Sequence, residues 1–240
     1  MAKTKTVYVC QNCGADSPKW IGKCNSCGQW NTYVEEILTK KTGSSGFSSR
    51  NEPARVEKLK DISVQITARI DTLDAEFNRV LGGGIVPGSL ILLGGEPGIG
   101  KSTLVLQLAL KLSHLKVLYV SGEESGQQLK LRAERLGGGK AIGDTLVYTE
   151  TNLQNILSLA EHEKPELIII DSIQTISSEF IESSQGSVSQ VRECAASLLK
   201  YAKETHTPII LIGHITKDGS IAGPKVLEHI VDTVLQFEGD

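Results

Sequence analysis

A glycine-rich segment of this sequence has the residue types and the spacing that hold the phosphates of a nucleotide. It reads Gly95, Glu96, Pro97, Gly98, Ile99, Gly100, Lys101, Ser102 and Thr103. Glycines let the backbone pass close to phosphate oxygens, and the N–H groups at the start of a helix point toward them. We expect Lys101 to contact the β- and γ-phosphates and Ser102 to bind Mg²⁺ through its hydroxyl. The segment therefore predicts a site for ATP and Mg²⁺.

Acidic residues that would complete such a site follow two apolar runs. Asp171 comes directly after residues 167–170, and Glu123 and Glu124 come shortly after residues 117–120. In open parallel sheets, ligands lie outside the carboxyl ends of the strands, where these carboxylates are expected. We predict that Asp171 holds Mg²⁺ and that Glu123, with Glu124 as the alternative, is the catalytic base that orients the attacking water. Two solvated turn glutamates are the simpler interpretation of positions 123 and 124.

A histidine ends another apolar run. His214 follows residues 209–212 and one glycine, so it is expected at the same edge of the sheet. We interpret it as a sensor of the γ-phosphate. A structural histidine with satisfied hydrogen bonds explains the residue equally well.

Four of the five cysteines form two Cys-x2-Cys pairs near the N-terminus. They are Cys10, Cys13, Cys24 and Cys27, with ten residues between the pairs and a glycine after each pair. This spacing is typical of a structural Zn²⁺ site with four thiolate ligands. A redox role is the alternative, and the presence of two pairs argues against it. Because the region has few apolar residues, metal binding is expected to supply most of its folding energy, on the order of 10 kcal/mol.

The sequence allows two interpretations of the basic and aromatic residues in this cysteine-rich region. The region contains Lys19, Trp20, Lys23 and Trp30. Basic and aromatic residues together bind single-stranded nucleic acid in many proteins, whereas packing of the tryptophans inside the small fold is the alternative. The fifth cysteine, Cys194, lies near the apolar face of an expected helix and is most simply a core residue.

Short apolar runs and helical segments alternate from about residue 56 onward. The runs at residues 90–93, 117–120, 146–148, 167–170, 209–212 and 233–237 are expected to be strands. Continuous apolar strands are buried on both faces, which predicts an α/β fold with a mostly parallel sheet covered by helices. Helices are expected at residues 104–112 and 152–163, and a longer one around residues 188–202. We therefore divide the chain into a zinc-binding module at residues 1–36, a Gly- and Ser-rich flexible linker at 37–55, and an ATPase domain at 56–240.

The overall composition narrows the possible partners. The chain has 240 residues and a net charge of −3, so contact with DNA would require a local basic patch or an assembly that builds a channel. No run of 18 or more apolar residues and no secretory signal is found, which excludes a membrane span and favours the cytoplasm. In that compartment the thiols stay reduced.

Several motifs together resemble the RadA (Sms) family of bacterial DNA repair proteins. The motifs are the cysteine, glycine and tryptophan pattern of residues 10–30, residues 81–89, the phosphate-binding segment, residues 121–125 and residues 170–175. The resemblance implies a RecA-like ATPase that forms a homo-oligomeric ring, with a hexamer expected, on single-stranded or branched DNA. It also implies branch migration and helicase activity beside the RecA recombinase. Two channel loops would map to residues 176–188 and 215–225, where Lys217 and Lys225 are candidate phosphate contacts.

The sequence departs from this family at one point. The family continues with a Lys-Asn-Arg-Phe-Gly motif and a Lon-protease-like domain, which these 240 residues do not contain. The resemblance therefore implies a partial chain that binds nucleotide, with ring assembly and coupling to DNA dependent on the remainder.

Other nucleotide-binding classes were weighed. A guanine-nucleotide switch is disfavoured because residues 171–174 lack the glycine of its switch motif. A RecA-like signalling ATPase would suit the paired glutamates but not the zinc module. A nucleotide-dependent scaffold, in which ATP binding orders a partner surface, remains as the third class.

Overall fold

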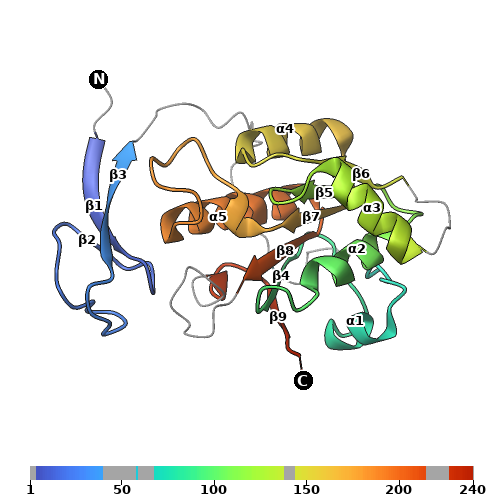
Figure 1. The fold of residues 1–240 in the computed structure, drawn as a ribbon, viewed down its shortest axis with the longest axis horizontal. Helices are drawn as coiled ribbons and strands as arrows, with labels where there is room; N and C mark the ends of the chain where they lie inside the picture. The colour runs from blue at the N-terminus through green and yellow to red at the C-terminus, as the bar shows by residue number, and fades with distance from the viewer. Residues whose placement is uncertain (1–3, 40–57, 59–67, 138–143, 215–226, 240) are drawn as a thin grey trace.

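The computed structural model describes residues 4–39, 58, 68–137, 144–214 and 227–239. Lys217 and Lys225 lie outside the described residues. The described chain forms a small antiparallel sheet near the N-terminus and a larger layered α/β part (Figure 1).

The small sheet carries the cysteine pairs. Its strands β1 (Thr4–Cys10), β2 (Asp16–Ser17) and β3 (Tyr33–Thr39) are antiparallel in the order β2-β1-β3. Its buried hydrophobic cluster comprises Cys10, Cys24 and Tyr33. We call residues 4–39 the zinc module, after the metal that their cysteines are predicted to bind. Strand β3 extends into the segment that was expected to be a linker, and residues 40–57 lie outside the described residues.

The larger part is built on a six-stranded parallel sheet, as the apolar runs predicted. The strand order is β6-β5-β7-β8-β4-β9. The strands are β4 (Leu90–Gly95), β5 (Val117–Ser121), β6 (Leu146–Tyr148), β7 (Leu167–Asp171), β8 (Ile209–His214) and β9 (Thr233–Phe237). The four central strands are almost fully buried, because helices cover both faces.

Alternate strand positions face two different helical layers. The helices are α1 (Ala75–Val80), α2 (Lys101–Lys111), α3 (Gly126–Gly137), α4 (Leu153–Glu163) and α5 (Val188–Thr205), with a 3-10 turn η2 (Ile173–Thr175). One buried cluster joins the sheet to α4 and α5, and the other joins it to α1, α2 and α3. Cys194 lies in the first cluster and is fully buried, as predicted. Among the described residues, no helix combines the length and the apolar character that crossing a membrane requires.

Most helix starts are fixed by a polar side chain. Asp74, Asn152 and Ser187 precede α1, α4 and α5, and each accepts a hydrogen bond from a backbone N–H in the first turn. Helix α2 begins differently, because Gly100 precedes it with φ 111° and offers no side-chain cap. The first N–H groups of α2 therefore have no side-chain acceptor.

The zinc module packs beside the N-terminal end of α5 (Figure 1). Arg192 Nη1 donates a hydrogen bond to the carbonyl oxygen of Gly14 at 2.8 Å, and the Val188 N–H donates to Gln11 Oε1 at 3.5 Å. Gly14 has φ 72°, and a Cβ there would lie 2.9 Å from Arg192 Nη1. The turn after the first cysteine pair therefore sits tightly against the larger part.

Candidate active site and metal centre

The glycine-rich segment lies between β4 and α2, as its sequence context indicated. Gly98 and Gly100 have φ values of 76° and 111°, a left-handed conformation that glycine adopts without strain. The uncapped N–H groups at the start of α2 lie next to this turn and match the requirement of phosphate oxygens. The residues present therefore fit a bound nucleotide.

Lys101 is the first residue of α2 and is only 3% exposed. Its ammonium group donates hydrogen bonds to the carbonyl oxygens of Gly95 and Glu96, both at 2.8 Å. Burial lowers the pKa of Lys101, and the charges of Asp171 and Glu123 act in the opposite direction. The lysine is thus folded back over the turn, beside both acidic residues that the sequence assigned to the site.

Asp171 and Ser102 meet at the carboxyl edge of the sheet. Ser102 Oγ donates to Asp171 Oδ1 at 3.1 Å, and Asp171 is 5% exposed. Tyr119 Oη donates to the other carboxylate oxygen, Oδ2, at 2.6 Å. Sequence reasoning missed Tyr119, because it appeared to be one more apolar residue of its strand. A serine hydroxyl and an oriented carboxylate are suitable oxygen ligands for Mg²⁺, either directly or through water.

Glu123 lies next to this pair and is held by two partners. Ser172 Oγ donates to Glu123 Oε1 at 2.6 Å, and His214 Nε2 lies 3.2 Å from the same oxygen. Burial alone would raise the pKa of Glu123, but the hydrogen bonds with Ser172 and His214 and the electrostatic attraction of His214 and Lys101 together outweigh burial and lower the pKa. Glu123 is therefore ionised at neutral pH, which a base requires.

Glu124 points to a different partner. It forms an ion pair with Arg132 of α3, and its backbone N–H donates to Ser121 Oγ at 3.0 Å. Gly122, the residue before this pair of glutamates, has no room for a side chain, because a Cβ would lie 2.5 Å from Thr175 Cβ. The turn therefore directs the two adjacent carboxylates to different neighbours.

The four predicted metal ligands come together in the zinc module. The sulfur atoms of Cys10, Cys13, Cys24 and Cys27 lie within 4.8 Å of one another, and two of the separations are 3.7 and 3.6 Å. Sulfurs bound to Zn²⁺ at about 2.3 Å in a tetrahedron are about 3.8 Å apart. The cluster therefore fits a tetrahedral Zn²⁺ ion.

The surroundings lower the pKa values of two of these thiols, Cys24 and Cys27, whereas burial raises the pKa of Cys13 to about 12. Burial would raise the pKa of Cys24, but hydrogen bonds from Tyr33 and from backbone N–H groups outweigh burial and lower the pKa to about 6. Tyr33 Oη lies 3.5 Å from Cys24 Sγ. Because the thiolate is the form that binds metal, this environment favours binding at neutral pH.

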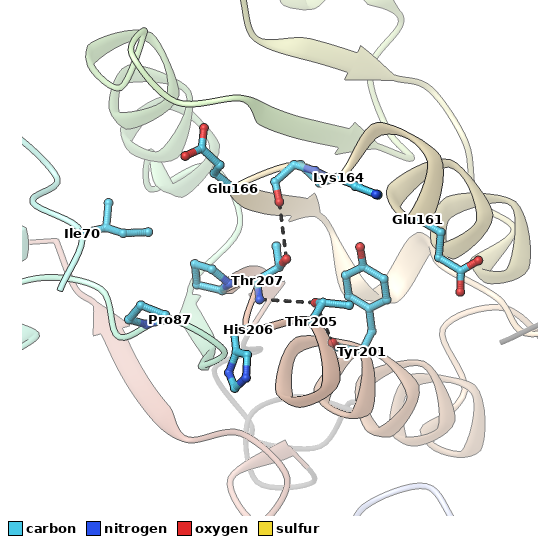
Figure 2. A pocket seen from close by; sticks show the side chains of 11 residues that line it. Ile70, Pro87, Glu161, Lys164, Glu166, Tyr201, Thr205, His206 and Thr207 are labelled. Carbon is cyan, nitrogen blue, oxygen red and sulfur yellow. Dashed lines mark hydrogen bonds between the residues drawn. The ribbon is translucent and has the colours of Figure 1, made fainter. Parts of the chain in front are cut away.

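A separate cavity of about 510 Å³ lies at the opposite end of the sheet (Figure 2). It lies at the amino ends of β7 and β8, where Pro165 and Pro208 line it together with Tyr201 and His206. The candidate active site lies at the carboxyl ends of the same strands. This cavity is therefore not part of the nucleotide site.

Comparison with known families agrees with this geometry. Residues 53–220 match the family described as AAA domain, and residues 8–35 match the rubredoxin metal binding domain. This chain belongs to the AAA domain family. The AAA domain match contains the glycine-rich segment, Glu123, Asp171 and His214, and the second match contains all four clustered cysteines.

Two curated proteins that are similar to this chain have the same protein name. The DNA repair protein RadA of Aquifex aeolicus is 54% identical over 242 residues, which cover 100% of this chain and 53% of the relative. The protein of the same name from Listeria monocytogenes is 51% identical and is covered to 52%. The resemblance to the RadA family is confirmed, and the chain spans about half the length of the curated relatives it matches.

A solved structure extends the comparison to the fold. A DnaB-like replicative helicase matches with a TM-score of 0.60 at 15% identity, covering 72% of this chain and 52% of that one. At this identity the likeness concerns the fold alone. It agrees with the RecA-like P-loop ATPase fold that the strand order and the site indicate.

Proposed function

We propose that this chain hydrolyses ATP and uses the reaction to act on DNA during repair. The observation that carries the proposal is the convergence of Lys101, Asp171 and Glu123 at one edge of the sheet, each with the polar partners that its role requires. Phosphoryl transfer to water needs a phosphate cradle, a metal-holding acid and a group that orients the water. All three lie beside the start of α2.

The chain's own residues divide these tasks. Within residues 95–103, the backbone N–H groups of residues other than Pro97 and the Lys101 ammonium would bind the phosphates, while Ser102 and Asp171 would hold Mg²⁺. The metal, when bound, neutralises charge on the β- and γ-phosphate oxygens. Glu123, ionised and free of any lysine or arginine ion pair among the described residues, accepts the proton of the attacking water.

Glu123 rather than Glu124 is assigned as the base because of their partners. Glu124 is neutralised by Arg132, whereas Glu123 accepts hydrogen bonds beside Asp171 and Lys101. His214 lies against the same Glu123 oxygen, and its Nδ1 is buried with no hydrogen-bond partner among the described residues. This position supports a role for His214 in sensing the γ-phosphate and the state of the base.

The action on DNA is proposed from the relatives and from the fold. The cited relatives are named DNA repair protein RadA, and one structural neighbour is a DnaB-like replicative helicase. We extend the proposal to branch migration as a helicase-like motor on single-stranded or branched DNA, in a homo-oligomeric ring, expected to be a hexamer, beside the RecA recombinase. Lys217 and Lys225 are proposed phosphate contacts of a channel loop, and the cytoplasm is the proposed compartment.

The domain roles follow the same proposal. The predicted division is a Zn²⁺-binding module at residues 1–36, a linker at 37–55 and an ATPase domain at 56–240. Because β3 continues to Thr39, we place the start of the linker after that strand. The cysteine geometry supports the first assignment, and the AAA domain match from residue 53 to 220 supports the third.

The decisive experiment measures phosphate release with and without single-stranded DNA, for this chain and, in parallel, for full-length RadA of Aquifex aeolicus, of which this chain covers 53%. We expect Glu123→Gln to lower turnover by about 100- to 10,000-fold while ATP still binds. Glu124→Gln is the matched control, because it changes the adjacent carboxylate in the same way, and it is expected to keep near wild-type turnover. Equal loss in both variants would remove the assignment of the base. No effect of DNA on either protein would count against a DNA motor.

A further inference from the structure

The two tryptophans of the zinc module lie on its surface. Trp20 is 53% exposed and Trp30 is 67% exposed. The cluster that fills the module consists of cysteines and Tyr33, with smaller contributions from its neighbours, and contains neither tryptophan. Packing of the module therefore does not explain them.

The two indoles lie side by side across a glycine. A Cβ placed on Gly22 would lie 3.7 Å from Trp20 and 3.7 Å from Trp30, so both rings border the same point. The Asn31 N–H donates to the carbonyl oxygen of Gly22 at 2.8 Å, and Lys23 pairs with Trp30 in an antiparallel bridge. The backbone segments that bear the two rings are thus hydrogen-bonded to each other next to the second cysteine pair.

Positive charge accompanies the rings. Lys23 Nζ lies 5.6 Å from the centroid of the Trp30 ring, and Lys19 is an exposed neighbour of Trp20 in the chain. A cation over an indole face is a favourable arrangement that also brings charge to the edge of the aromatic surface. We call Lys19, Trp20, Lys23 and Trp30 the aromatic platform.

We propose that the aromatic platform binds single-stranded nucleic acid by stacking bases on Trp20 and Trp30, with Lys19 and Lys23 at the phosphates. Exposed aromatic rings flanked by lysines are the combination that binds unpaired bases without sequence preference. Tryptophan is enriched at protein–protein interfaces but lysine is depleted there, so the two lysines beside the rings are what favours nucleic acid over a protein ligand. The inference rests on the proposed action on DNA and places a DNA contact outside the ATPase domain.

The composition of the chain offers a direct assay. Trp20 and Trp30 are its two tryptophans, so intrinsic tryptophan fluorescence reports on the platform alone. A deoxythymidine oligonucleotide added to the zinc-loaded 240-residue chain, without ATP, is expected to quench this fluorescence to saturation. A duplex of equal length is expected to quench much less, because its bases are already stacked.

Variants separate stacking from charge. Trp30→Ala is expected to weaken binding of a fluorescent oligonucleotide, measured by anisotropy, by about 5- to 150-fold. Trp30→Phe is expected to retain most of the affinity, since it keeps an aromatic face. Lys23→Gln is expected to reduce the slope of log affinity against log salt by about 0.7. Val34→Ala removes an apolar side chain of the same module that is 50% exposed, and it is the matched control without effect.

The outcomes distinguish this inference from the proposed function. Zinc content and ATP turnover without DNA are measured in every variant, and we expect both to equal the wild type, which excludes misfolding. If DNA stimulates ATP turnover but does not quench the tryptophan fluorescence, the proposal that the aromatic platform binds nucleic acid is overturned, and the proposed action on DNA is still supported. Saturable quenching without any stimulation of turnover would support the platform and count against the motor.

Discussion

Replacement of Tyr119 by phenylalanine tests whether a buried hydroxyl orients the metal-binding carboxylate. Tyr119 Oη donates to Asp171 Oδ2 at 2.6 Å, and the two residues are 0% and 5% exposed. Burial and the adjacent Asp171 charge raise the pKa of Tyr119, so the hydroxyl stays protonated and remains a donor at every working pH. Phenylalanine keeps the ring in the core and removes this donor alone.

The magnitude follows from the type of bond. A hydrogen bond to a charged group contributes about 1.5–3 kcal/mol to stability. In a protein of this size a change of about 1 kcal/mol shifts Tm by about 2–4 °C, so Tyr119→Phe is expected to lower Tm by about 3–12 °C. Among the described residues, the Asp171 carboxylate would then keep one hydrogen bond, the one from Ser102. We therefore also expect half-maximal ATP turnover to require a higher Mg²⁺ concentration.

The assays are calorimetric melting and phosphate release as a function of Mg²⁺ concentration. Tyr148→Phe is the control, since Tyr148 lies on edge strand β6 and its hydroxyl contacts Glu150 rather than Asp171. An unchanged Tm together with an unchanged Mg²⁺ requirement would refute the reasoning. A lower Tm with the wild-type Mg²⁺ requirement would show that the hydrogen bond stabilises the fold, and it would refute the role of Tyr119 in positioning Asp171 for the metal.

Three further changes test other parts of the structure. Lys101→Ala removes the ammonium from the phosphate cradle and should lower turnover about 100- to 1,000-fold, measured by phosphate release; unchanged turnover would end that assignment. Cys10→Ser with Cys13→Ser should abolish zinc binding in elemental analysis, whereas Cys194→Ala, in the buried core, should keep the metal. Asp74→Ala removes the cap of α1 and should cost about 0.5–2 kcal/mol in denaturant unfolding. The main cause of the lowered Asp74 pKa is a hydrogen bond from a lysine of α2. The stabilisation that ionised Asp74 provides is therefore complete above its ordinary pKa of 3.8 and is lost as the pH falls through the lowered pKa.

The sheet and the phosphate cradle could be predicted because their signals are local. Each central strand contains a run of apolar residues, because burial on both faces strongly favours apolar side chains there. The cradle depends on glycines with positive φ next to a helix start, which a single short segment encodes. The cysteine cluster could be predicted in the same way, since two short turns place all four sulfurs.

The partners of the site could not be predicted, because they depend on strand register. In the parallel pairing of β5 and β7, Ser121 lies opposite Asp171, and Tyr119 lies two residues earlier on the face that packs against α2 and α3. Nothing in the sequence pairs Tyr119 with Asp171 or Arg132 with Glu124. Helix α3 was also missed, because most of its residues are polar and only Leu129 and Ala133 are buried on it.

Hydrogen bonds connect the candidate base to the zinc module through loop 176–188. Ser172 donates to Glu123, Thr175 Oγ1 donates to the carbonyl oxygen of Ser172 at 2.7 Å, and the Gln185 side chain donates to the carbonyl oxygen of Thr175. The far end of the loop meets the zinc module at Val188, where α5 begins. Gln190, 2% exposed, holds the middle of the loop through the backbone of residues 178, 181 and 183. The loop is therefore anchored at one end to the group that contacts the base and at the other to the zinc module, so its placement depends on both.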